Sequence, residues 1–232
     1  MLVALLIGNS DGIGLALTRL LLERGWQVSG VSRSASPVRS PAYSHTIADV
    51  REPEYPARLR ALVNELPDLT LCVYCAGMGE PLELDSMSQE RAVFETNLIG
   101  AVVTAQVVIP ELVRAGHGHF IGLSSQADVL IDKRAPSYVA SKAGLSSYLE
   151  GLALACRPQG VAVTNLRFGF VDTKMAKASL RPFMITPEQA ARRIESCLRR
   201  RPMRDTYPKR MALLVWLLRL GSRVKRRLLL QG

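Results

Sequence analysis

The sequence has few of the features that mark secreted, disordered or membrane-spanning proteins. Only 4 of its 232 residues are cysteine, and neither a low-complexity tract nor a repeat at solenoid spacing interrupts it. The apolar segment 2–7 has no basic leader before it and no small-residue cleavage site after it, so we interpret it as a strand and not as a signal peptide. The apolar run 211–220 is too short to span a bilayer. We therefore expect a globular cytoplasmic chain with reduced thiols.

Cysteine and histidine show no metal-ligating pattern. Cys72 and Cys75 form a CxxC pair, but they lie in an apolar stretch of strand character, 69–75. Residues three apart on a strand point to opposite faces, so we expect neither a metal nor a redox role for this pair. His117 and His119 have no matching pair of ligands nearby, and we expect them in a loop and not in a zinc site.

The positive charge is concentrated near the C-terminal end. The formal net charge is +10, and residues 192–232 contain 13 Lys and Arg side chains against two acids, Glu195 and Asp205. The other residues are thus nearly neutral, and the basic segment indicates an anionic partner at that end. Nucleic acid is not expected, because the basic residues lie in no recognisable nucleic-acid-binding fold.

Strand-like and helical segments alternate along the chain. We expect strands at 2–7, 26–32, 44–48, 69–75, 118–124, 161–168 and, very short, at 203–207. Helices are expected at 13–24, 54–66, 88–114 and 137–156, and another from Thr186, where a Thr-Pro-Glu-Gln sequence can cap it. This order predicts an α/β fold: a three-layer doubly wound Rossmann fold with a mostly parallel sheet. Residues 1–207 would form this domain, and 208–232 a basic, apolar helical extension.

Three glycines, Gly8, Gly12 and Gly14, lie between the first expected strand and the first expected helix. Glycine allows a tight turn and a close approach of the backbone, so the amides at the helix N-terminus can bind a pyrophosphate. This context predicts a dinucleotide-binding loop. The intervening residues that would also contact the dinucleotide are Asn9, Ser10, Asp11 and Ile13.

Tyr138 and Lys142 are four residues apart on the expected helix 137–156 and therefore lie on one face of it. A nearby ammonium favours phenolate and lowers the pKa of a tyrosine, which suits a general acid/base. Ser125 follows the expected strand 118–124, at the carboxyl edge of the sheet, where it can donate a hydrogen bond to a substrate carbonyl.

The GxxxGxG loop, Ser125 and the YxxxK pair occur with the order and spacing of the short-chain dehydrogenase/reductase family, which the chain resembles over residues 2–207. The resemblance implies an NAD(P)(H)-dependent enzyme that interconverts a carbonyl and an alcohol, with Asn97, Ser125, Tyr138 and Lys142 as its catalytic residues. It implies that Asn97 holds a water in the proton relay to Lys142. We also expect a homo-oligomer. Further cofactor contacts implied by the resemblance are Asp49, Val50, Cys75, Ala76, Gly77, Tyr138, Lys142, Gly169, Val171 and Thr173.

The chain departs from the family pattern at three places. Ile7 stands where threonine is usual before the first glycine, and Tyr74-Cys75 stands where the family has two asparagines. Both changes remove polar side chains that would tie the cofactor loops together. Phe168 replaces the proline before Gly169 in the segment over the nicotinamide.

The residues after the second strand decide the expected cofactor. An NAD enzyme of this type has a carboxylate there for the ribose hydroxyls, whereas this chain has Ser32 and Arg33. With no acid to repel a 2′-phosphate, and with a guanidinium that can bind one in a fork, NADP(H) is preferred. NAD(H) stays the alternative. Arg33 would also suit an ordinary solvent-exposed arginine, and the acidic Asp11 in the glycine loop counts against binding of a 2′-phosphate.

The expected substrate is a small carbonyl or alcohol compound, apolar or lipid-like, because the short lid at 173–185 contains Met175, Leu180, Phe183 and Met184. The same residues would also suit an ordinary packed loop.

Segment 209–232 combines apolar residues with basic ones, which fits peripheral contact with an anionic membrane on its inner face. A helix packed on the core or on a second subunit is the alternative there. The alternative function is that of a non-catalytic protein that binds a dinucleotide and senses redox state. Such a protein would need none of the catalytic residues.

Overall fold

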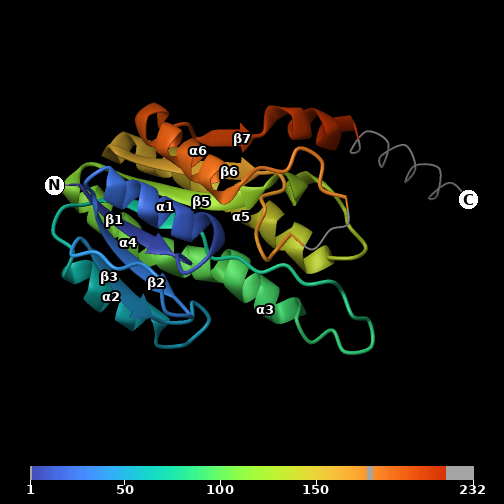
Figure 1. The fold of residues 1–232 in the computed structure, drawn as a ribbon, viewed down its shortest axis with the longest axis horizontal. Helices are drawn as coiled ribbons and strands as arrows, with labels where there is room; N and C mark the ends of the chain where they lie inside the picture. The colour runs from blue at the N-terminus through green and yellow to red at the C-terminus, as the bar shows by residue number, and fades with distance from the viewer. Residues whose placement is uncertain (1, 177–179, 218–232) are drawn as a thin grey trace, which may run out of the picture.

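The computed structural model describes residues 2–176 and 180–217 and has three layers (Figure 1). Within these residues, seven strands form one sheet in the order β3-β2-β1-β4-β5-β6-β7, and every neighbouring pair is parallel. The strands are β1 Val3–Ile7, β2 Gln27–Ser32, β3 Tyr43–Ile47, β4 Leu69–Tyr74, β5 Gly118–Ser125, β6 Val161–Phe168 and β7 Arg204–Tyr207.

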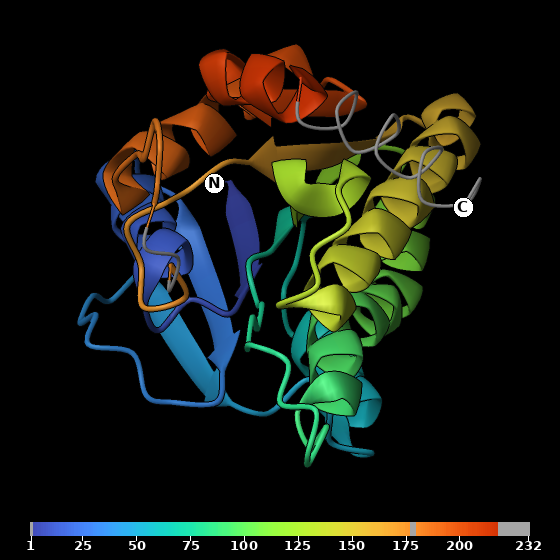
Figure 2. The same cartoon turned by 90° about the vertical axis from the view of Figure 1, so that its right-hand side faces the viewer.

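Helices cover both faces of the sheet, as Figure 2 shows. On one face lie α1 (Gly12–Glu23) and α6 (Pro187–Arg200), which contact each other. On the other lie α2 (Tyr55–Asn64), α4 (Gly100–Ala115) and α5 (Pro136–Cys156). The shorter helices are α3 (Glu90–Phe94), the π-helix η1 (Glu95–Ile99), and the 3-10 turns η2 (Gln126–Val129) and η3 (Arg157–Gln159).

Burial of the sheet on both faces explains the continuous apolar runs of its strands. In β1 all five residues are buried; Leu5 and Ile7 pack towards α2, α4 and α5, whereas Ala4 and Leu6 pack towards α1 and α6. The direction of winding changes between β1 and β4. The carboxyl ends of these strands therefore border the crevice where an open α/β sheet binds its ligands.

The predicted doubly wound α/β fold is confirmed, with one difference of note. The sequence pattern predicts one helix over 88–114, but the structure divides this region into α3, η1 and α4. The π-helix is a single turn within a longer helical run, too short for an apolar pattern to separate it from α-helix. Asn97 lies within η1.

The structure shows where the cysteines and His119 lie relative to the sheet. All four cysteines are free, and Cys72 and Cys75 pack on opposite faces, as their spacing predicts. The expectation of a loop is wrong for His119, which is buried in β5, where Nε2 lies 2.7 Å from Thr164 Oγ1. The apolar run 118–124 is a central strand, and the Thr164 hydroxyl partners the imidazole inside it.

One helical run in the described part of the chain, Glu90–Ala115, is long and apolar enough to cross a bilayer, with a mean hydropathy of 1.6. Half of its apolar window is buried inside the protein, and Ala101, Ala105 and Leu112 pack on the sheet. A core helix of a Rossmann fold passes the same test of length and composition.

The chain after Pro208 continues as a helix over 209–217. Met211 and Val215 are buried on the protein, whereas Leu213, Trp216 and Leu217 are more than half exposed. One face of the segment thus packs on the core, and an apolar face remains open to solvent. The basic residues at 223–227 lie outside the described residues.

Candidate active site

The glycine loop at the end of β1 has a backbone that only glycine permits. Gly8 has a φ of +83°, and a Cβ there would lie 2.5 Å from the backbone nitrogen of Ala76. A Cβ at Gly14 would lie 2.2 Å from the carbonyl oxygen of Gly8. The loop therefore lies directly against the segment after β4, and α1 begins at Gly12, so the amides of its first turn lie beside this loop. This geometry fits a dinucleotide pyrophosphate.

Asn9, expected among the cofactor contacts, turns its side chain into the protein. It is fully buried, and Nδ2 donates to the hydroxyl of Tyr43 at 2.8 Å and to Thr18 Oγ1 at 3.1 Å. The Tyr43 hydroxyl lies 2.9 Å from Nδ1 of His45, whose Nε2 lies 3.1 Å from the carbonyl oxygen of Ser34. This network joins the glycine loop to the end of β2. Sequence reasoning missed it, because its members are far apart in the chain and form no motif.

Asp11 ties the glycine loop to the segment after β6. Its carboxylate accepts a hydrogen bond from the Gly12 amide at 2.8 Å and pairs with Lys174 Nζ at 2.7 Å. The hydrogen bond from Lys174 is the main reason why the pKa of Asp11 is lowered. A Cβ at Gly12 would lie 3.0 Å from the Thr173 methyl group, so these two predicted cofactor residues are in proximity. Lys174 was not predicted, since a lone lysine in a loop gives no signal.

Tyr138 and Ser125 meet as predicted at the carboxyl edge of the sheet. Ser125 Oγ accepts from the amide of Ala127 at 3.1 Å. Burial raises the pKa of Tyr138, and the Ser125 side chain, which lies near the phenol, opposes that rise in part. Ser125 ends β5 and Tyr138 lies in the first turn of α5, so two adjacent elements position the pair.

Lys142 lies one turn further along α5 and is only 5% exposed. Its Nζ donates to the carbonyl oxygen of Leu123 at 2.9 Å, and burial lowers its pKa to about 8. The expectation that Lys142 lowers the pKa of Tyr138 is not met in this state, because loss of water around the phenol dominates. The ammonium is itself desolvated and engaged by the Leu123 carbonyl.

Asn97 is buried in the π-helix and bonds to the loop after β4. Its Oδ1 accepts from the Met78 amide at 2.7 Å, and its Nδ2 donates to the Met78 carbonyl at 2.8 Å and to Ser141 Oγ at 3.0 Å. Both ends of the amide are thus used by the protein. The side chain holds the Met78 loop against α5, one turn from Tyr138 and Lys142.

The loop after β4 forms the floor beside these residues. A Cβ at Gly77 would lie 3.2 Å from Met175 Cε and 3.7 Å from Lys142 Nζ, and one at Gly79 would lie 3.3 Å from the Tyr138 ring. Met175, from the short lid, therefore lies next to the predicted catalytic residues. Cys75 is partly buried beside them, and burial raises its pKa to about 12.

At the other end of the crevice lie the residues expected at the adenine and ribose. Arg33 is exposed and forms no hydrogen bond or ion pair with the other described residues, but it lies close enough to Asp49 to help lower the pKa of that carboxyl. The larger cause is Arg51, which pairs with Asp49 at 2.6 Å and was not predicted. Ser32 Oγ donates to the carbonyl of Ser34, and Val50 packs at Gly100.

The segment expected over the nicotinamide is held by two neighbours. Val171 forms a β-bridge with Ile185, and the Gly169 amide donates to the carbonyl of Tyr207 at 2.9 Å. A Cβ at Gly169 would lie 3.0 Å from Met211 Cγ. The first turn of the C-terminal helix therefore packs on the active-site segment, a contact that no sequence signal indicated.

Comparisons with known proteins agree with this geometry. The profile described as short chain dehydrogenase matches residues 2–182. An uncharacterized oxidoreductase of Myxococcus xanthus is 30% identical over 90% of this chain and 88% of its own length. A 3-oxoacyl-(acyl-carrier-protein) reductase of Vibrio cholerae is 30% identical over 76% of each chain. A short-chain dehydrogenase from Burkholderia cenocepacia, solved in complex with NADP, aligns with a TM-score of 0.82 at 24% identity, covering 98% of this chain and 95% of its own.

The fold, the glycine loop and the Ser125, Tyr138 and Lys142 arrangement define a nicotinamide-dependent oxidoreductase. The chain belongs to the short-chain dehydrogenase family, whose members act on CH–OH and C=O groups with a nicotinamide cofactor.

Proposed function

We propose that this chain is an NADP(H)-preferring enzyme that interconverts a carbonyl and an alcohol, with Tyr138 as its general acid/base. The proposal depends above all on the convergence of Ser125, Tyr138, Lys142 and Asn97 at the carboxyl edge of the sheet, where the Ser125 side chain opposes the rise in the pKa of Tyr138. These four side chains come from β5, α5 and the π-helix η1. A protein that only bound a dinucleotide would not need them.

Each residue has a separate task in this mechanism. Bound NADP(H) would supply or take up the hydride. The Ser125 hydroxyl donates a hydrogen bond to the substrate oxygen and stabilises charge that develops there. The Tyr138 hydroxyl gives a proton to that oxygen during reduction and receives it during oxidation. The Lys142 ammonium stabilises the phenolate, and Asn97 holds the Met78 loop in place and, as the family resemblance implies, a relay water.

The substrate is proposed to be apolar, because the lid residue next to the catalytic groups is Met175. The name of the Vibrio cholerae relative adds 3-oxoacyl thioesters to the compounds worth testing. The direct test is NADPH oxidation by the purified protein against ketones, fatty aldehydes and 3-oxoacyl thioesters. Turnover of one class supports the enzyme. Tight NADPH binding without turnover on any of them would favour the redox sensor.

Arg33→Ala should raise the dissociation constant of NADPH at least about tenfold and leave that of NADH nearly unchanged, since a charge-assisted bond is worth roughly 1.5–3 kcal/mol. The exposed guanidinium, with no hydrogen-bonded partner among the described residues, is available for a 2′-phosphate. Fluorescence titration with both cofactors measures the effect, and Arg60→Ala, an exposed arginine on α2, is the control. Equal losses for both cofactors would reject the assignment.

We also propose that the catalytic domain, 1–207, assembles as a cytoplasmic homo-oligomer whose C-terminal extension makes peripheral contact with anionic membrane. The support is the exposed apolar face of the helix at 209–217, with Trp216 56% exposed. Met211 and Val215 are buried, so deletion of the whole extension would uncover the core. The sharper variant combines Trp216→Ser with deletion of residues 218–232.

The full chain should sediment with vesicles that contain anionic lipid and not with neutral ones, and the variant should sediment with neither. Basic residues contribute roughly 1 kcal/mol each through a screened attraction. High salt should therefore weaken the attachment only in part, because the apolar contribution is insensitive to salt. NADPH binding by the variant, at the wild-type level, shows that the domain is intact. A full chain that stays in the supernatant would exclude this contact.

A further inference from the structure

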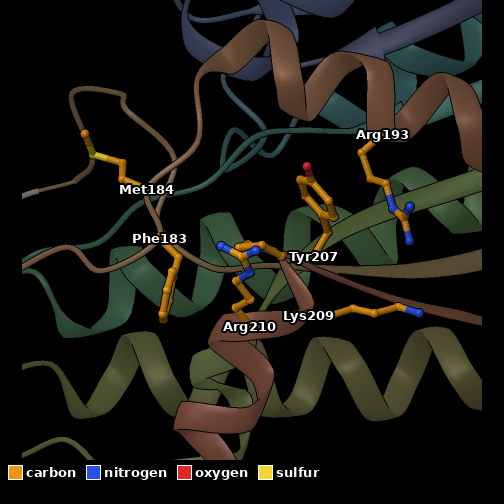
Figure 3. Close-up of a pocket in the computed structure, with 7 residues that line it drawn as sticks. Phe183, Met184, Arg193, Tyr207, Lys209 and Arg210 are labelled. Atoms are coloured by element: carbon orange, nitrogen blue, oxygen red, sulfur yellow. The ribbon is translucent and has the colours of Figure 1, made fainter.

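A pocket of about 520 Å³ lies beside the lid segment (Figure 3). Its walls come from the segment before Ile185 (Phe183 and Met184), from Arg193 of α6, and from residues 207–210 at the end of β7 and the start of the next helix. None of the catalytic residues lines it. Its volume is within the usual range for small-molecule sites.

The pocket has cationic side chains and no acidic one. Arg193 is already engaged: it donates to Asp205 at 2.5 and 2.6 Å and stacks 5.0 Å from the centre of the Tyr207 ring. Arg210 is exposed and forms no ion pair or hydrogen bond with the other described residues. Figure 3 shows its side chain between Phe183 and Tyr207. An uncompensated guanidinium is thus directed across the pocket, where it can bind an anionic group in a fork.

The neighbouring wall is apolar. Phe183 and Met184 are 46% and 41% exposed, so a large part of each apolar side chain faces solvent. Phe183 has a φ of +54°, a left-handed conformation that aromatic residues rarely adopt. The backbone two residues further on is held by the pairing of Ile185 with Val171, and Phe183 lines the same pocket as Arg210.

We propose that this pocket binds an anionic amphiphile: the acidic head, a phosphate, sulfate or carboxylate, pairs with Arg210, and the apolar chain lies on Phe183 and Met184. Charge alone would suit a simple anion, and apolar surface alone would suit a neutral chain. Their adjacency selects molecules that have both. Neither the cofactor loop nor Tyr138 contributes to the site, which shares Phe183 and Met184 with the lid expected over the substrate.

Calorimetric titration of the full chain with octyl phosphate, below its critical micelle concentration and without cofactor, tests this site. We expect saturable binding that Arg210→Gln weakens at least about tenfold, or 1.4 kcal/mol. Lys209→Gln is the matched control, since Figure 3 shows this adjacent side chain extending away from Phe183; it should weaken binding much less. Phe183→Ala should weaken octyl phosphate but not ethyl phosphate, which has almost no chain.

Two further experiments identify where octyl phosphate binds and whether the natural ligand is a free amphiphile or a lipid headgroup. Glutamine at the four basic positions 223, 225, 226 and 227 should leave octyl phosphate binding unchanged. Arg210-dependent binding of the monomeric probe supports a free amphiphile, whereas Arg210-dependent binding only to vesicles with anionic phospholipid supports a lipid headgroup. Absence of saturable binding to both, binding unaffected by Arg210→Gln, or loss of binding on the 223–227 changes alone would overturn the proposal.

Discussion

Tyr138→Phe is expected to lower the turnover of a verified substrate by about 100- to 10,000-fold, the usual contribution of a general acid/base. The change deletes the phenol hydroxyl near Ser125 and leaves the ring beside Gly79. The glycine loop is not touched, so NADPH should bind with nearly the same affinity. Steady-state kinetics and a cofactor titration on the same preparation separate the two effects.

Tyr148→Phe is the matched control for this change, because Tyr148 lies on the same helix and makes no hydrogen bond to a catalytic residue. It should retain wild-type turnover.

Burial raises the pKa of Tyr138, so alcohol oxidation, which needs the phenolate, should rise with pH through the neutral and alkaline range. Normal turnover by Tyr138→Phe would show that the proton comes from another group.

Lys142→Met should abolish turnover and at the same time stabilise the cofactor-free protein. The side chain is 5% exposed, and burial lowers its pKa from 10.5 to about 8. Below pH 8 Lys142 stays protonated in the folded protein, so the folded state bears the full free-energy cost of burying its charge. The methionine removes that cost, of order 3 kcal/mol, but leaves the Leu123 carbonyl without its donor, at about 1–2 kcal/mol. A net gain of roughly 1–2 kcal/mol at pH 7 follows.

The pH dependence gives this prediction a second readout. Between about pH 8 and 10.5 the unfolded chain binds a proton at Lys142 that the folded chain has lost, so wild-type stability should rise with pH across this window. The contribution of Lys142→Met should shrink over the same range. Urea unfolding at pH 7 and pH 9.5 measures both, with the exposed Lys133→Met as control. A destabilised Lys142→Met at pH 7 would show that the lysine is held by favourable contacts.

Local signals were sufficient for much of the fold and part of the site. The alternation of buried strands and helices predicts the doubly wound sheet, because apolar runs between turns have few other ways to be covered. Tyr138 and Lys142 were predicted from a four-residue spacing on one helix, and both lie on α5. Gly8 and Gly14 were found from a strand-to-helix turn, and the structure shows backbone contacts there that exclude a side chain.

Contacts between distant segments could not be found in this way. Asp11 with Lys174, Arg51 with Asp49, and the network from Asn9 through Tyr43 to His45 depend on which loops meet at the sheet edge. The π-helix around Asn97 was not predicted either, since a single turn is too short for an apolar pattern to separate it from α-helix. The pKa of Tyr138 was expected to fall and instead rises, because desolvation depends on packing that no spacing describes.

The sequence by itself determined the class of fold, and it predicted the crevice at the carboxyl edge and the side chains proposed to act there, because each depends on residues that are neighbours along the chain. Only the tertiary structure decided how the lid closes on the glycine loop, how the helix after Pro208 packs on Gly169, and how Phe183 comes to face Arg210. Those arrangements arise when segments far apart in sequence are buried together, and the free energy of that burial belongs to the whole fold.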